Sequence, residues 1–193
     1  GFQLTCSAAS LILVAVANTV GPMFALSPVQ ILLVNIVMDG PPAQSLALSH
    51  VPRERLLKQP DASELLSLGR IIHSVLRALL IVGLTCAFTA TSGQVPFTAF
   101  LMLTLVAALT FAADWNRWLW VCVAGGAVFT QIAGSVAALR ALFGVPWMGV
   151  REWAAMGVCI SGYLVGCAIL VFLEGRWRAV MSIRAMAKGY ATV

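Results

Sequence analysis

Six apolar runs, each long enough or nearly long enough to cross a lipid bilayer, dominate this sequence. They cover residues 2–20, 28–48, 68–90, 97–113, 118–139 and 153–173. The hydrocarbon core of a bilayer is about 30 Å thick and is crossed by a helix of about 20 apolar residues. Only helices and closed barrels satisfy their backbone hydrogen bonds in lipid, and continuous runs of this length favour helices. We therefore expect an all-α membrane protein with six transmembrane helices.

The overall composition points the same way. Hydrophobic residues make up 61% of the chain and charged residues 10%, whereas soluble domains carry about 25% charged residues. The net charge of +5 is spread over the connecting segments, which favours contact with a lipid bilayer and not with nucleic acid. The five cysteines lie in apolar runs without CxxC spacing, so we expect them to pack as small side chains. They are Cys6, Cys86, Cys122, Cys159 and Cys167.

The Lys and Arg residues indicate how the helices are oriented. Nine lie in or beside three segments that six helices would place on one side of the membrane. These nine are Arg53, Arg55, Lys58, Arg70, Arg117, Arg176, Arg178, Arg184 and Lys188. Only Arg140 and Arg151 fall on the opposite side, and Arg77 lies within a run. Since positive charge favours the cytoplasmic side, both termini are predicted to be cytoplasmic, with residues 174–193 as a basic tail.

The run 28–48 contains an acidic residue and a strong helix break. Asp39 is the only carboxylate within the six runs, and an acid at bilayer depth costs at least about 2.5 kcal/mol on insertion scales. The sequence Gly40-Pro41-Pro42 follows at once. Because proline has no N–H, the carbonyl groups of Val37 and Met38 lose their usual helical donors. Such carbonyl groups are tolerated in a membrane only where they face protein or a polar cavity.

These features together predict a cation site. Asn35 lies four residues before Asp39, so both side chains emerge on one helix face. An amide oxygen, a carboxylate and free carbonyl groups are hard ligands that suit Ca²⁺, Mn²⁺ or Mg²⁺. The alternative is a kinked helix in which Asp39 only caps the helix or pairs with a neighbour. Gln44, beyond the break, is expected either to shape the site, as residues 40–42 do, or to bond another helix.

Two further pairs of residues are four positions apart, so each pair would lie on one face of a helix. His73 and Arg77 are four residues apart, and we expect them to extend to the lipid headgroups, with a proton relay as the alternative. Gly162 and Gly166 form a small-xxx-small pair, which predicts close packing against another helix.

The segment VNIVMDGPPAQSLAL, residues 34–48, closely resembles the sixth transmembrane helix of P-type Ca²⁺-transporting ATPases. DGPPAQSL resembles the secretory-pathway Ca²⁺/Mn²⁺ branch, and FQLTCSAASL, residues 2–11, is similar to its preceding helix. The later runs match in layout only. The resemblance implies that residues 1–193 form a C-terminal transmembrane domain, the last six of ten helices. It also implies that Asn35, Asp39 and the Val37 and Met38 carbonyls form half of one site for transported Ca²⁺ or Mn²⁺.

The same resemblance implies one cation per cycle. In the two-site pumps of muscle type, the positions of Ser7, Ser10 and Thr104 carry an amide and two carboxylates, and that of Met38 carries a hydroxyl. None of these groups is present at the matching positions here. The one-site pattern of the secretory-pathway branch therefore fits better.

The ATP chemistry of this family is not found in the sequence. Neither its phosphorylated DKTGT motif nor a P-loop occurs, and the chain begins Gly-Phe-Gln. We therefore expect a chain cut from a longer one, unable to hydrolyse ATP alone. The longer chain would supply the first four spans and the actuator, nucleotide-binding and phosphorylation domains, through which ATP and Mg²⁺ would act. The alternatives are a stand-alone six-span membrane protein, such as a channel or accessory subunit, or an inactive fragment.

Overall fold

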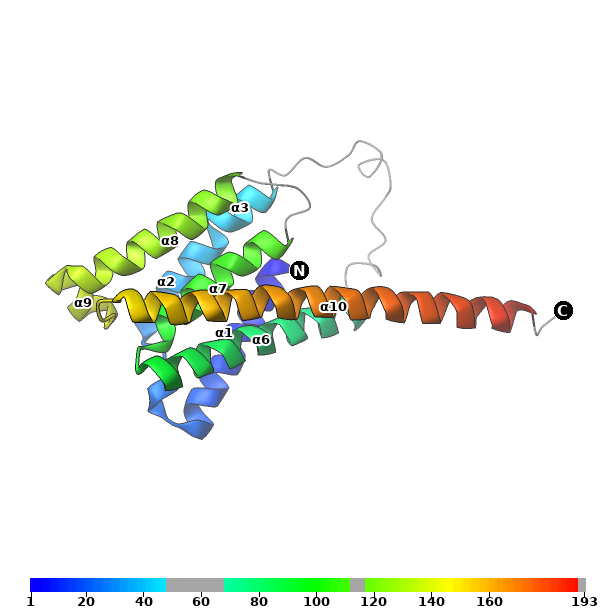
Figure 1. Ribbon diagram of the computed structural model, residues 1–193, viewed down its shortest axis with the longest axis horizontal. Coiled ribbons are helices and arrows are strands. Elements are labelled where there is room, and N and C mark those ends of the chain that lie inside the picture. Colours follow the sequence, from blue (N-terminus) through cyan, green and yellow to red (C-terminus); the bar gives the residue numbers. More distant parts are fainter. Residues whose placement is uncertain (48–67, 112–116, 191–193) are drawn as a thin grey trace.

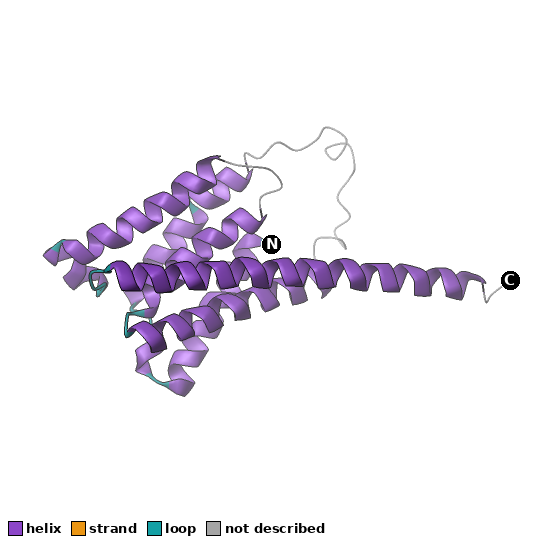
Figure 2. Ribbon diagram, in the orientation of Figure 1, coloured by secondary structure: helices purple, strands orange, loops and turns teal. Residues whose placement is uncertain are grey.

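The computed structural model describes residues 1–47, 68–111 and 117–190, and every regular element in these ranges is a helix (Figure 2). The elements are α1 (Phe2–Val20), the 3₁₀ helix η1 (Pro22–Phe24), α2 (Pro28–Asp39), α3 (Pro41–Ala47), α6 (Leu68–Ser92), α7 (Pro96–Phe111), α8 (Arg117–Ser135), α9 (Ala137–Phe143) and α10 (Val150–Tyr190). This confirms the prediction of an all-α chain. The connecting residues 48–67 and 112–116, which carry several of the counted basic residues, lie outside the described ranges.

Within the described ranges, five stretches are long and apolar enough to cross a membrane. They are Phe2–Val20, Pro22–Gln44, Gly69–Ser92, Arg117–Ser135 and Val150–Arg176. The chain is thus built as a multi-pass integral membrane protein. The remaining apolar helix, α7, has 16 residues and is about 24 Å long at 1.5 Å per residue, which is short of a bilayer core. A sixth span therefore stays a prediction.

The short helix α7 lies at the centre of the bundle. Every residue from Pro96 to Ala108 is buried, because α1, α2, α3, α6, α8 and α10 all pack against it (Figure 1). A helix that is apolar on all sides is typical either of a buried helix or of a membrane span. The contacts of α7, and not its composition alone, therefore show that it is central.

The pair α6 and α10 packs through small residues. A Cβ atom added at Gly166 would lie 2.5 Å from Leu80 Cδ2, and one at Gly162 would lie 3.6 Å from Leu84 Cδ2. The close helix contact predicted from the two glycines is confirmed. Further along the seam, the thiol of Cys159 donates a long hydrogen bond of 3.9 Å to the carbonyl oxygen of Leu84.

Two helices differ in length from the apolar runs. The run 118–139 divides at Val136 into α8 and α9, and Gly144 ends α9 with a left-handed φ of 61°. Helix α10 continues without a break to Tyr190, so that the first part of the basic tail extends the last helix beyond the bundle (Figure 1).

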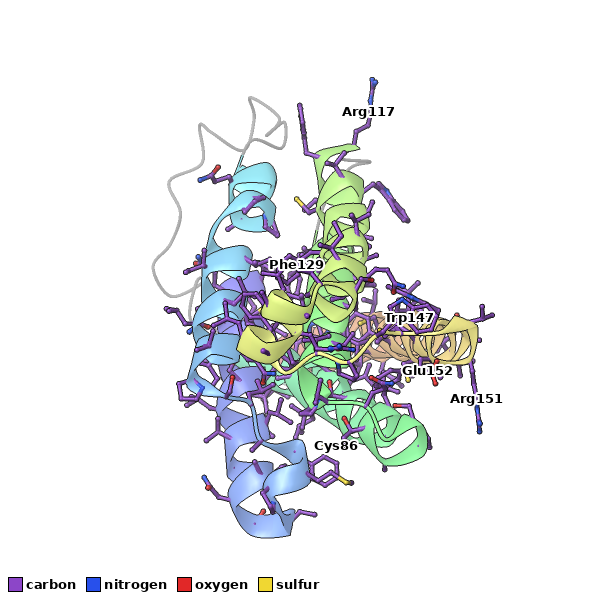
Figure 3. The ribbon with its side chains drawn as sticks, turned by 90° about the vertical axis from the view of Figure 1, so that its left-hand side faces the viewer. Cys86, Arg117, Phe129, Trp147, Arg151 and Glu152 are labelled. Atoms are coloured by element: carbon purple, nitrogen blue, oxygen red, sulfur yellow. The ribbon has the colours of Figure 1, made fainter. Side chains whose placement is uncertain are left out.

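The two ends of the bundle are distinct. Helix η1, residues 93–95 and residues 144–149 lie toward one end, and the N-terminus lies on the side toward which α10 projects (Figure 1). Figure 3 shows Arg117 and Arg151 pointing away from the bundle, and both side chains are exposed. Phe129 packs within it, with its ring centroid 5.6 Å from that of Phe143.

Candidate cation site

The break between α2 and α3 is where the prolines predict it. Helix α2 starts with a capping box, in which Ser27 and Gln30 satisfy each other's backbone N–H groups. It ends at Asp39, and α3 begins at Pro41. The N–H of Gly40 donates to the carbonyl oxygen of Ile36 at 3.0 Å. The next two residues are prolines, so the carbonyl groups of residues 37 and 38 receive no backbone donor four residues on.

The side chain of Asn35 faces away from the packed core. Asn35 is exposed, as are its neighbours Leu32 at 61% and Ile36 at 60%, whereas Val34 is buried. No described helix therefore covers the face of α2 that carries Asn35. A polar amide on an apolar helix is costly in lipid unless it finds a partner. This face is thus suited to ligands or helices from outside the described residues.

The other predicted site residues are placed less completely. The side chains of Met38 and Asp39 lie outside what the structure describes, so the distance between the Asn35 and Asp39 oxygens stays a prediction. In α3, Pro42 is buried and Gln44 is exposed. The site thus has a defined backbone break and one outward-facing amide.

Ser10 and Thr104 lie where the two-site pumps carry carboxylates, and their hydroxyl groups donate hydrogen bonds within their own helices. The hydroxyl of Ser10 donates to the carbonyl oxygen of Cys6 at 3.0 Å. That of Thr104 donates to the carbonyl oxygen of Phe100 at 2.8 Å, and Thr104 is fully buried. A hydroxyl group is neutral and adds no carboxylate charge at these positions. Among the described residues, no cluster of three or more His, Cys, Asp or Glu side chains occurs.

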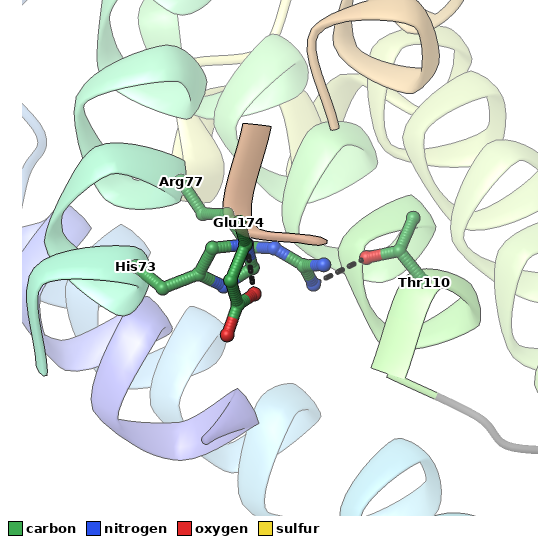
Figure 4. A network of polar contacts seen from close by, with 4 residues as sticks. All are labelled: His73, Arg77, Thr110 and Glu174. Atoms are coloured by element: carbon green, nitrogen blue, oxygen red, sulfur yellow. Dashed lines mark hydrogen bonds and ion pairs between the residues drawn. The ribbon is translucent and has the colours of Figure 1, made fainter. Parts of the chain in front are cut away.

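A second polar constellation lies between α6, α7 and α10 (Figure 4). Arg77 is only 5% exposed and donates a hydrogen bond from Nη1 to Thr110 Oγ1 at 3.0 Å. His73 Nε2 lies 3.5 Å from Glu174 Oε2. The prediction that Arg77 extends to the lipid headgroups is therefore wrong, because a threonine 33 residues later in the chain provides an interior acceptor. Spacing along one helix carries no signal for such a partner.

The architecture and the site define a class: a multi-pass helical membrane protein with a polar break in one spanning segment. The family "Cation transporting ATPase, C-terminus" matches residues 23–176. That is most of the chain, and the chain belongs to this family.

Curated relatives agree with this assignment. Calcium-transporting ATPase 1 of Schizosaccharomyces pombe is 26% identical over 185 residues, covering 84% of this chain and 21% of that protein. Calcium-transporting ATPase type 2C member 2 of Homo sapiens is 27% identical over 187 residues, covering 89% and 20%. The same protein of Mus musculus is 38% identical over 84 residues, covering 42% and 9%. The chain thus spans about a fifth of the length of the relatives that match most of it.

Proposed function

We propose that this chain is the C-terminal membrane portion of a P-type ATPase that moves Ca²⁺ across a membrane. The observation that carries the proposal is the proline break after Asp39, which leaves two carbonyl groups without backbone donors beside an outward-facing Asn35. The break lies inside the segment that matches the family. The names of the relatives, calcium-transporting ATPases, support Ca²⁺ as the ion.

The proposed ligands are the side-chain oxygens of Asn35 and Asp39 and the carbonyl oxygens of Val37 and Met38. Residues 40–42 keep α2 and α3 from joining into one continuous helix, and Gln44 of α3 shapes the site. Ca²⁺ takes six to eight oxygen ligands, so these groups supply about half of its shell. The other ligands come from spans of a longer polypeptide that cover the exposed face of α2.

In this proposal six helices cross the membrane, α7 among them, as the last six of ten, and both termini are cytoplasmic. The basic residues counted in the sequence support this orientation, and the N-terminus lies on the side of the bundle toward which α10 projects (Figure 1). ATP and Mg²⁺ act on actuator, nucleotide-binding and phosphorylation domains outside this chain. We infer that the 193 residues alone neither hydrolyse ATP nor bind the cation tightly.

We further propose a single site that accepts Mn²⁺ as well as Ca²⁺. The bonded hydroxyl groups of Ser10 and Thr104 support one site, because neither residue adds a carboxylate for a second dication. Mn²⁺ is content with six oxygen ligands and competes at a site with few carboxylates. Mutual inhibition of Ca²⁺ and Mn²⁺ uptake and one cation per phosphorylation are expected in vesicles. Two Ca²⁺ per ATP would contradict the single site.

Phosphorylation by ATP tests the ligand assignment in the full-length protein. Asp39→Asn removes the charge of the proposed ligand and should abolish the Ca²⁺-dependent phosphoenzyme. Glu152→Gln is the matched control: the same change at a carboxylate that accepts the Gly149 N–H at 2.9 Å, far along the chain from the site. Normal phosphoenzyme in Asp39→Asn would refute the assignment. Gln44→Ala should alter the ratio of Mn²⁺ to Ca²⁺ uptake more than the total activity.

A further inference from the structure

Arg77 is a charged side chain buried within a helix long enough to span a membrane. It is 5% exposed and lies on the third turn of α6. Removing a guanidinium group from water is costly unless its charge and its N–H groups find partners. A long basic side chain near a helix end would ordinarily extend to the interface. The inward position of Arg77 therefore needs a specific set of contacts.

The last residues of α7 provide two such contacts, although the buried Nε of Arg77 has no hydrogen-bond partner among the described residues. Besides the hydrogen bond from Arg77 Nη1 to Thr110, the hydroxyl of Thr110 donates to the carbonyl oxygen of Ala107 at 2.8 Å. A hydroxyl can donate and accept at once, so Thr110 is a fixed acceptor for the arginine. The guanidinium carbon of Arg77 lies 4.4 Å from the ring centroid of Phe111, within cation–π range. Arg77 is thus held against the end of α7.

The ring of Phe111 continues the contact to α1. Its centroid lies 5.9 Å from that of Phe2 with an interplanar angle of 65°, an edge-to-face arrangement. A Cβ atom at Gly1 would lie 2.9 Å from Phe111 Cε1, and Phe2 is 6% exposed. Arg77, Phe111 and Phe2 form one continuous stack, the Arg77–Phe111–Phe2 stack. It joins α6, α7 and the first residue of α1.

Helix α6 is held independently on its other side. Its Leu80 packs against Gly166 of α10, and His73 lies 3.5 Å from Glu174 at the far end of the same seam. The stack therefore attaches the N-terminal end of α1 to a helix, α6, that also packs against α10.

We propose that Arg77 is a positioning residue that seats the N-terminal end of α1 on α6 and α7 through Phe111, and that this seat keeps transport coupled to ATP hydrolysis. The inference rests on the proposed function, because α1 packs against α2, the helix that carries the proposed ligand Asn35. Arg77 does not bind the cation, since its own positive charge would repel it. It acts only through the position of α1.

Hydrogen–deuterium exchange on the purified chain in detergent tests the seat without any transport. Arg77→Leu removes the guanidinium group, and Phe111→Leu removes the aromatic ring while keeping an apolar side chain. Both should raise amide exchange in residues 5–9, the first amides of α1 with helical acceptors, by about tenfold, a change of the size expected for losing a desolvated cation–π contact. Exchange in residues 13–20 should not change. Unaltered exchange in residues 5–9 in both variants would overturn the seat.

The chain offers a matched control for the loss of an aromatic ring. Arg176 Cζ lies 5.9 Å from the ring centroid of Phe172, which is 63% exposed on α10. Phe172→Leu makes the same chemical change as Phe111→Leu at a cation–π pair on the outside of α10. It should leave exchange in α1 as in the unmodified chain.

The coupling is tested in the full-length protein in vesicles. The amount of Ca²⁺ taken up per ATP hydrolysed should fall in Arg77→Leu and Phe111→Leu and stay normal in Phe172→Leu. A purely structural role would lower both rates together and leave the ratio unchanged, which would overturn the coupling. An unmodified protein that moves no Ca²⁺ would refute the proposed function and the coupling with it, while the exchange result would still decide the seat.

Discussion

Alanine substitutions at three glycines of α8 place the same added methyl group in three different surroundings. At Gly125, a Cβ atom meets nothing within 4 Å. At Gly126, it would overlap Cδ1 of Leu105, the mobile end of a side chain. At Gly134, it would lie 2.8 Å from the carbonyl oxygen of Pro146, a backbone atom. Contacts below 3.0 Å force a shift, and a backbone atom shifts at greater cost than a side-chain end.

The expected changes in the free energy of unfolding follow from two opposing terms. Alanine in place of glycine within a helix gains about 1 kcal/mol, and an additional methyl group in a packed region costs about 1–3 kcal/mol. Gly125→Ala should therefore stabilise the chain by up to about 1 kcal/mol. Gly126→Ala should lose about 0–2 kcal/mol, because Leu105 can rotate. Gly134→Ala should lose about 2 kcal/mol or more, because the loop before α10 must move.

Thermal unfolding of the three variants in one detergent measures this order directly. The melting temperature should be highest for Gly125→Ala, intermediate for Gly126→Ala and lowest for Gly134→Ala. Equal melting temperatures for Gly125→Ala and Gly134→Ala would refute the close approach of α8 to the loop, since the helix-propensity gain is the same in both.

Three further substitutions give outcomes of different size. Gln30→Leu should lower the free energy of unfolding by about 1–2 kcal/mol, measured by heat or denaturant, because it removes the side-chain acceptor of the Ser27 N–H, one half of the capping box of α2, and the donor to the Phe143 carbonyl oxygen. Glu174→Gln should change it by less than about 1 kcal/mol, because its ion pair is partly exposed. Gly166→Leu should lower the melting temperature well below that of Gly157→Leu, because only Gly166 faces another helix closely.

Much of the fold could be predicted from the sequence because bilayer thickness and proline chemistry act locally. A continuous apolar run must become a helix in lipid, and Pro41 and Pro42 must interrupt one, whatever lies around them. The division at Val136 also had a local signal, the preceding Gly134 and Ser135, since such pairs favour kinks.

The polar interior could not be predicted, because it depends on which helices become neighbours. The spacing of His73 and Arg77 indicates a common face but not what covers it. Their partners, Thr110 and Glu174, lie on two other helices. The complete ligand set of the cation site could not be predicted for the same reason. Asn35 faces outward, and the other ligands of the site depend on what packs on that face of α2.

The enclosure of α7 by six other helices has a consequence for how the chain is made. Helices enter the membrane in the order in which they are synthesised. Helix α7 is therefore made before α8 and α10, two of the helices that pack against it. Until both have been inserted, α7 lacks part of the packing that surrounds it in the finished bundle. Premature termination before α10 thus leaves an uncovered α7, and we expect quality-control proteases to remove such products faster than the whole chain.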